Sequence, residues 1–206
     1  MMKYDGILFD LDGTLWDSVD QLTPAWQRVL GEYGVKTDAA QLRSMMGKTA
    51  EYFAAALLPM LPPPEGLAVI ARCCREELFD LAKTGGTLYP QLEATLAPLS
   101  ETHKLFIVSN CQKGYIETFL TAHDLRRYFT DWENHEQTGL SKADNIRLVV
   151  SRNGLNAPVY VGDTESDECS ANEAGVPFIH AAYGFGTAKH PIMALRHISE
   201  LLDFLP

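Results

Sequence analysis

Five short apolar runs, each followed by enough chain for a helix, limit the fold more than any other feature of this sequence. They lie at about residues 5–11, 104–110, 128–132, 158–163 and 177–183. Runs of this length with β-branched and aromatic residues are typical of strands buried on both faces. Strands that alternate with helices predict βα units and a mainly parallel sheet. We therefore expect an α/β fold with a Rossmann-like parallel sheet.

Residues 16–85 break this alternation, because they contain no convincing strand and several helix boundary signals. Capping residues such as Asp17 or Ser18, together with glycines and prolines, predict four helices. These lie at about residues 17–34, 38–47, 49–62 and 64–83. We therefore predict a small, inserted, all-helical cap at residues 16–85 and a discontinuous α/β core formed by residues 1–15 and 86–206.

The end of the chain is expected to add one more helix to this core. Apolar residues recur through the segment 190–206, and a terminal helix there would pack four of them against the core. These four are Leu195, Ile198, Leu201 and Leu202.

The bulk properties of the chain limit the partners that it can bind. Its 206 residues allow one core plus a compact insert. The formal net charge of −10 and the lack of a segment rich in Lys or Arg argue against nucleic acid as a partner. The longest apolar stretch, around residues 52–61, is about half as long as a bilayer span requires, so no membrane segment is expected.

The first residues and the cysteine spacing indicate the compartment. The chain begins Met1-Met2-Lys3-Tyr4-Asp5, without the basic and apolar regions of a signal peptide. The four cysteines show no C-x-x-C or Cys/His ligand spacing, so neither zinc nor a disulfide framework is indicated. We expect a cytoplasmic protein, and the composition fits a monomer or a homodimer.

Two carboxylates follow the first apolar run. Asp10 and Asp12 lie two residues apart in the segment Asp10-Leu11-Asp12-Gly13-Thr14, at the predicted carboxyl end of a strand. Both could point into one crevice, and the turn at Gly13 could direct backbone N–H groups toward a phosphoryl oxygen. Because Asp-Gly is also a common turn dipeptide, this segment indicates a site only together with others.

Three further polar segments are expected at the same edge of the sheet. Ser109 and Asn110 end the second run, where open α/β sheets place their ligands. Lys142 begins a predicted helix, a position where a cation is unfavourable without an anionic partner. The segment 162–167, GDTESD, places three carboxylates after a buried strand, and a cation would relieve their repulsion. Oxygen ligands without His or Cys favour a hard ion, so we predict Mg²⁺.

Together these segments resemble the haloacid dehalogenase-like (HAD) hydrolase superfamily, in particular its phosphatases similar to phosphoglycolate phosphatase. The resemblance covers essentially the whole chain, with the helical insert after the first strand. It rests on FDLDGTLWDS at 9–18, VSN at 108–110, the lysine at 142 and GDTESD at 162–167, in the order of the family. Ala143 departs from it, because many relatives have proline there. The resemblance implies a phosphatase that hydrolyses a small phosphomonoester, such as phosphoglycolate or a sugar phosphate, through an aspartyl-phosphate.

The resemblance also implies how the reaction centre is built. Asp10 would be the nucleophile, while Asp12 would protonate the leaving group and then activate water. The Mg²⁺ ion would be held by the side chains of Asp10 and Asp163 and by the backbone carbonyl of Asp12.

Further matching residues would surround the phosphoryl group. Thr14, Ser109 and Asn110 would hold it, and Lys142 would neutralise charge on it and on Asp10. Asp167 would orient Lys142 or a water molecule on the metal.

The cap is expected to close over the site and to set specificity. Lys48, in the short connection between two predicted cap helices, is a candidate for contact with a carboxylate or hydroxyl of the substrate. Arg43 is an alternative, and both residues also fit ordinary surface positions.

Three other classes of protein share parts of this pattern. A phosphomutase would share every core motif, and the sequence does not separate it from a phosphatase. A haloacid dehalogenase of the same fold would lack the carboxylate at Asp12. A receiver domain, which binds a phosphoryl group without being a hydrolase of this kind, would be little more than half as long and would have no cap.

Overall fold

Six parallel strands form the central sheet of the protein, in the order β5-β4-β1-β6-β7-β8. The structure is a computed structural model that describes residues 4–205. Residues 1–3, on which the expected lack of a signal peptide partly rests, and Pro206 lie outside that range. The strands are β1 (Gly6–Phe9), β4 (Lys104–Ser109), β5 (Phe129–Asn134), β6 (Pro158–Gly162), β7 (Phe178–Ala181) and β8 (Met193–Leu195).

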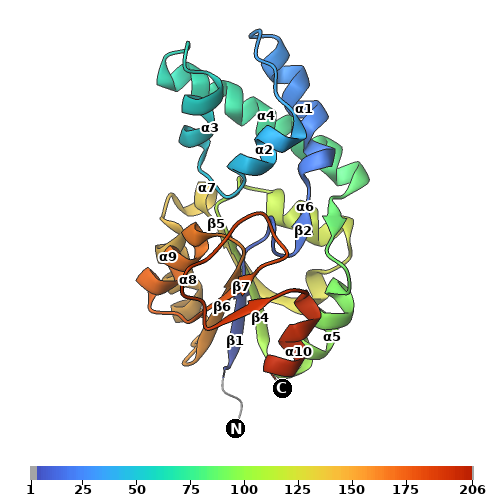
Figure 1. Ribbon diagram of the computed structural model, residues 1–206, viewed down its shortest axis with the longest axis vertical. Coiled ribbons are helices and arrows are strands. Elements are labelled where there is room, and N and C mark those ends of the chain that lie inside the picture. The colour runs from blue at the N-terminus through green and yellow to red at the C-terminus, as the bar shows by residue number, and fades with distance from the viewer. Residues whose placement is uncertain (1–3, 206) are drawn as a thin grey trace.

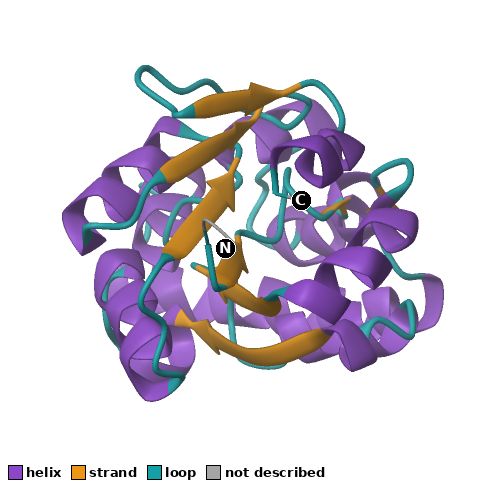
Figure 2. Cartoon of the chain, turned by 90° about the horizontal axis from the view of Figure 1, so that it is seen from below, coloured by secondary structure: helices purple, strands orange, loops and turns teal. Residues whose placement is uncertain are grey.

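Helices cover both faces of this sheet (Figure 2). Ile7 and Phe9 of β1 belong to a hydrophobic cluster on one face and Leu8 to a cluster on the other, because successive strand residues point to opposite sides. The first cluster includes residues of α5 (Leu92–Thr102), α6 (Tyr115–Ala122) and α10 (Leu201–Phe204). The second includes residues of α8 (Lys142–Arg152) and α9 (Glu165–Ala174). The predicted α/β fold with a parallel sheet is confirmed.

Four helices form a cap at one end of the core (Figure 1). They are α1 (Val19–Gly31), α2 (Ala39–Met45), α3 (Ala50–Leu57) and α4 (Pro63–Thr84). The cap has a hydrophobic cluster of its own, centred on buried residues such as Trp26 and Ile70. The antiparallel pair β2 (Trp16–Asp17) and β3 (Thr87–Leu88) lies where the chain enters and leaves the cap. The inserted helical cap is therefore present, while its boundaries at residues 16–85 stay a prediction.

The last residues differ from the predicted terminal helix. Met193–Leu195 form β8, which pairs in parallel with the edge of β7, and only the short helices η2 (Ile198–Glu200) and α10 follow. An edge strand presents unpaired backbone groups, and pairing with β8 satisfies them, which favours an extended segment here. Two short elements complete the list: η1 (Arg126–Tyr128) and α7 (His135–Thr138). Among residues 4–205, no helix has both the length and the apolar character that crossing a bilayer requires.

Candidate active site

The carboxyl ends of three neighbouring strands bring the main candidate residues together. Asp10 directly follows β1, Ser109 ends β4 and Asp163 directly follows β6. Strand β1 pairs with both β4 and β6, so these ends lie side by side at one edge of the sheet. The backbone N–H of Asp10 also donates to the carbonyl of Val161 at 2.8 Å, which fixes the chain just beyond β1.

A buried lysine lies between two of the carboxylates. Lys142 begins α8, and its side chain is only 4% exposed. Its Nζ donates to Oδ1 of Asp10 at 2.7 Å and to Oδ1 of Asp167 at 2.5 Å. Burial disfavours the charged lysine, but the two carboxylates outweigh this effect and raise the pKa of Lys142 well above its usual value. Lys142 is therefore a cation held against Asp10.

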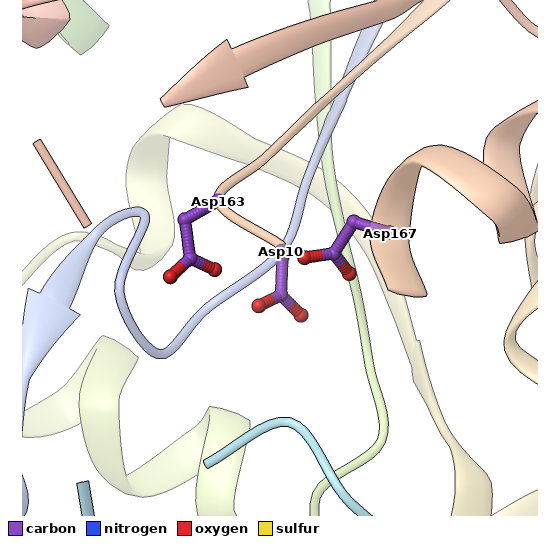
Figure 3. Close-up of side chains that lie close together, drawn as sticks. All are labelled: Asp10, Asp163 and Asp167. Atoms are coloured by element: carbon purple, nitrogen blue, oxygen red, sulfur yellow. The ribbon is translucent and has the colours of Figure 1, made fainter. Parts of the chain in front are cut away.

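Three buried aspartates form a group that could hold a metal ion. Asp10, Asp163 and Asp167 each present one carboxylate oxygen within 4.8 Å of the others, as Figure 3 shows. Oδ1 of Asp163 is buried without a hydrogen-bond partner among the described residues. Burial and then the charges of Asp167 and Asp10 raise the pKa of Asp163 to about 8. Burial likewise raises the pKa of Asp10 to about 6, although Lys142 opposes this shift. Within residues 4–205, the three carboxylates have only one neighbouring cation, Lys142, so their negative charge is not fully balanced. A cluster of oxygen ligands of this kind fits a Mg²⁺ ion.

The neighbouring backbone fixes two of these carboxylates. The N–H of Phe185 donates to Oδ2 of Asp163 at 2.7 Å. Gly184 allows this close approach, because a Cβ at that position would lie 2.4 Å from Cβ of Asp163. At the start of α9, the N–H and hydroxyl of Thr164 donate to Oδ2 of Asp167 at 3.0 and 2.7 Å. The sequence analysis missed the loop after β7, whose signal is the segment Gly184-Phe185-Gly186.

The carboxylate of Asp12 has a different environment and lies outside this group of three. Its Oδ1 accepts hydrogen bonds from Trp16 Nε1 at 3.0 Å, Ser18 Oγ at 3.0 Å and Tyr115 OH at 2.9 Å. Burial and the charge of Asp10 raise the pKa of Asp12 to about 7, against the effect of these hydrogen bonds. The sequence analysis missed all three donors. Ser18 precedes α1 as predicted, yet its hydroxyl makes no hydrogen bond to the helix N-terminus.

Two of the four predicted phosphate-binding residues line the cavity, and the other two do not. Ser109 and Asn110 line a cavity together with Asp10 and Asp12, and Nδ2 of Asn110 donates to the carbonyl of Gly47 in the cap at 3.2 Å. Thr14 and Lys142 do not line the cavity. The hydroxyl of Thr14 is buried, without a hydrogen-bond partner among the described residues.

The cavity between cap and core has a volume of about 550 Å³. Of the two candidate substrate-binding cations of the cap, only one lines it. Lys48 lines it and is exposed, with its Nζ 5.9 Å from the ring centre of Tyr52. Arg43 does not line it and instead pairs with Asp17 at 3.0 Å and with Asp20 at 3.3 Å. The structure thus places Lys48, and not Arg43, beside the cavity.

A buried carboxyl group in the cap wall is a further residue that the sequence analysis missed. Glu77 of α4 is 3% exposed, lines the cavity and accepts hydrogen bonds from Trp26 Nε1 in α1 and from Gln112 Nε2 in the core. Burial raises the pKa of Glu77 to about 8. Its place in the sequence gives no signal, because Glu77 stands among other charged residues of one helix.

Glu77 should make the stability of the protein depend on pH. The unfolded chain loses the Glu77 proton near the ordinary value of 4.5, while the folded protein keeps it up to about 8. Within that window the unfolded state binds fewer protons, so Glu77 lowers the free energy of unfolding by about 1.4 kcal/mol per pH unit as pH rises. Glu77→Gln, which is neutral at every pH, should lack this slope.

Urea unfolding of both proteins across this pH window would measure the difference. Other buried carboxyl groups contribute equally to both, so the difference between the two curves isolates Glu77. Parallel curves would mean that Glu77 ionises normally in the folded protein.

The chain is similar to known proteins over nearly its whole length. A family model described as haloacid dehalogenase-like hydrolase matches residues 7–181. A phosphoglycolate phosphatase from Yersinia pseudotuberculosis is 30% identical over 213 residues, which cover 96% of this chain and 91% of that protein. A phosphoglycolate phosphatase from Rhodobacter capsulatus is 30% identical over 206 residues, which cover 96% and 92%. A haloacid dehalogenase-like family hydrolase from Streptococcus pneumoniae has the same fold, with a TM-score of 0.85, 24% identity and full coverage of both chains.

Proposed function

The chain belongs to the haloacid dehalogenase-like hydrolase family and is a phosphoric monoester hydrolase, and from this premise we propose its substrate and its mechanism. It is a magnesium-dependent phosphatase that hydrolyses a small phosphomonoester, such as phosphoglycolate or a sugar phosphate, through an aspartyl-phosphate on Asp10. One observation carries the proposal: Lys142 Nζ lies between Asp10 and Asp167. Phosphate esters resist anionic nucleophiles, and a fixed cation offsets the charge of both reactants.

Asp10 and Asp12 divide the chemistry between them. In the first step an oxygen of Asp10 bonds to phosphorus as the bond to the leaving oxygen breaks, and Asp12 gives its proton to that oxygen. A pKa of about 7 for Asp12 supports this role, because part of the group is protonated near neutral pH. In the second step Asp12 takes a proton from water as the water oxygen bonds to phosphorus. The bond to Asp10 then breaks and inorganic phosphate leaves.

The proposed metal ligands are the side chains of Asp10 and Asp163 and the backbone carbonyl of Asp12. A carboxylate oxygen of Asp167 lies within 4.8 Å of one from each of these two side chains, and Asp167 is proposed to orient Lys142 or a water molecule on the metal. A bound Mg²⁺ ion would supply positive charge to the phosphoryl oxygens. The unpartnered Oδ1 of Asp163 supports this assignment.

The remaining predicted residues would hold the substrate. Ser109 and Asn110 line the cavity beside Asp10 and are proposed to donate to phosphoryl oxygens. Thr14 is proposed to do so through its buried, unpartnered hydroxyl. Lys142 would bind the phosphoryl group, and Lys48 of the cap would contact the leaving group.

The proposed partner is therefore a small phosphorylated metabolite. A net charge of −10 does not favour nucleic acid.

A location in the cytoplasm stays a prediction. A monomeric or homodimeric state also stays a prediction, and light scattering on the purified protein would test it.

Hydrolysis of p-nitrophenyl phosphate and of a panel of phosphorylated metabolites tests the function. We expect magnesium-dependent release of inorganic phosphate, and the panel would rank phosphoglycolate against sugar phosphates and nucleotides. Folded protein that hydrolyses none of these esters would contradict the proposal.

Removal of divalent metal should abolish the activity and lower the stability. EDTA is expected to reduce the rate by about two orders of magnitude or more, and added Mg²⁺ should restore it. Mg²⁺ should also raise the unfolding temperature, because it binds only the folded cluster of carboxylates. Asp163→Asn should weaken this stabilisation, which thermal unfolding at several Mg²⁺ concentrations would measure. A wild-type unfolding temperature that does not change with the Mg²⁺ concentration would contradict the proposed site.

A further inference from the structure

The wall that the cap contributes to the cavity is mainly apolar. All four cap helices contribute side chains to the lining, which also includes Asp10 and Asp12 of the core. The largest of them are the half-buried Leu67 and Leu78, together with Leu22, Trp26, Phe53 and Ile70, which also belong to the buried hydrophobic cluster of the cap. Contact of a charged or hydroxylated ligand group with such a wall does not favour binding, because that group would lose its hydration without a new hydrogen-bond partner. Contact with an apolar group does favour binding.

The size of the cavity points the same way. Its volume of about 550 Å³ lies in the range of sites that enclose drug-sized ligands. A two-carbon leaving group such as glycolate would leave most of this space to water in contact with apolar side chains.

The basic side chains Lys48, Arg75 and Lys113 of the lining lie at exposed positions, as do the acidic Glu51 and Glu136, while the buried carboxyl groups of the lining are Asp10, Asp12 and Glu77. None of the three basic side chains forms an ion pair among residues 4–205. They can attract a phosphate dianion to the mouth of the cavity. Within the wall, both oxygens of Glu77 are hydrogen-bonded by Trp26 and Gln112, and its raised pKa keeps it neutral over most of the physiological range.

We propose that the substrate is a phosphomonoester with an apolar leaving group, aliphatic or aromatic, that fills the cap side of this cavity while its phosphoryl group contacts Asp10. This inference rests on the proposed phosphatase mechanism, but it replaces the polar substrates named there, phosphoglycolate and sugar phosphates, with apolar esters. Phosphoglycolate would then be a poor substrate for this chain.

Binding of n-alkylphosphonates tests the ligand class without any turnover. These compounds carry a phosphoryl group that is not hydrolysed, and calorimetry on the wild-type protein with Mg²⁺ measures their affinity. Each added methylene that enters an apolar site should tighten binding about fourfold until the cavity is full. An affinity that does not change with chain length would overturn the inference.

Two alanines of α4 provide a matched pair of variants. Ala71 and Ala68 are both exposed on this helix, but only Ala71 lines the cavity. Ala71→Phe should occupy the apolar space and flatten the chain-length series. Ala68→Phe adds the same ring outside the cavity and should keep the wild-type series. Equal effects of the two variants would mean that the series does not report on this cavity.

Kinetics then separate the inference from the function on which it rests. We expect kcat/KM for n-alkyl phosphates to rise with chain length and to exceed the value for phosphoglycolate. Faster hydrolysis of phosphoglycolate than of every apolar ester would overturn the inference and support the proposed function. Phosphonate binding that tightens with chain length, without hydrolysis of any ester, would overturn the proposed function and support the apolar ligand class.

Discussion

Asp10→Asn should lower kcat by a factor of about 10⁴ or more on every substrate, because an amide oxygen does not form the acyl phosphate. The variant should still fold. Asparagine has nearly the same shape, and the loss of one buried carboxylate relieves part of the repulsion with Asp163 and Asp167. Circular dichroism and steady-state kinetics would measure both effects. Asp203→Asn, an exposed aspartate on α10, is the control and should leave the rate unchanged.

Chemical trapping on the wild-type enzyme tests the proposed intermediate. Enzyme quenched in acid during turnover and then treated with borohydride should contain a reduced residue at position 10, because borohydride reduces an acyl phosphate and not a free carboxylate. Mass spectrometry of the peptides would locate it. Reduction at another aspartate, or a variant that keeps most of its activity, would exclude Asp10 as the nucleophile.

Lys142→Met is the second change with a large expected effect, and it should reduce both activity and stability. Activity should fall by about 10³, because Asp10 and the phosphoryl group would lose their fixed cation. The free energy of unfolding should fall by about 3–5 kcal/mol, because Asp10 and Asp167 would stay buried without a positive partner. Lys36→Met removes an exposed lysine and should change neither quantity.

A double variant separates the two effects of Lys142→Met. Adding Asp167→Asn removes one of the two unpaired carboxylates, while the new amide oxygen can still accept from Thr164. The double variant should regain part of the lost stability but none of the lost activity. If it were as unstable as Lys142→Met alone, the stability loss would come from packing of the lysine stem and not from unpaired charge.

Local sequence patterns predicted five strands of the central sheet and the four cap helices, but not the short strands β2, β3 and β8. The central residues of β1, β4 and β6 are apolar, because these strands are buried on both faces, and a run of this kind has few alternatives. The segment at 193–195 was predicted as helix and is strand β8. Its pattern fits either state, and the free edge of β7, which the local pattern does not contain, favours the strand.

The candidate site was predicted to the extent that its residues follow strands. Asp10, Ser109 and Asp163 were placed together because parallel strands end at one edge of the sheet. Tyr115 lies 103 residues from Asp12, and no pattern near either residue indicates their hydrogen bond. Likewise, no local pattern indicates the hydrogen bond between Glu77 of the cap and Gln112 of the core.

The sequence by itself determined the α/β core with its inserted cap, the family, and the edge of the sheet at which the chemistry is expected. These conclusions follow from local patterns of apolar and acidic residues, and each pattern lies within a single short segment of the chain. Only the tertiary structure decided which groups surround Asp12, how deeply Lys142 is buried between the two expected carboxylates, and that the cap side of the cavity is mainly apolar. These features depend on contacts between segments distant in sequence, and packing, burial and charge compensation become defined only when those segments meet.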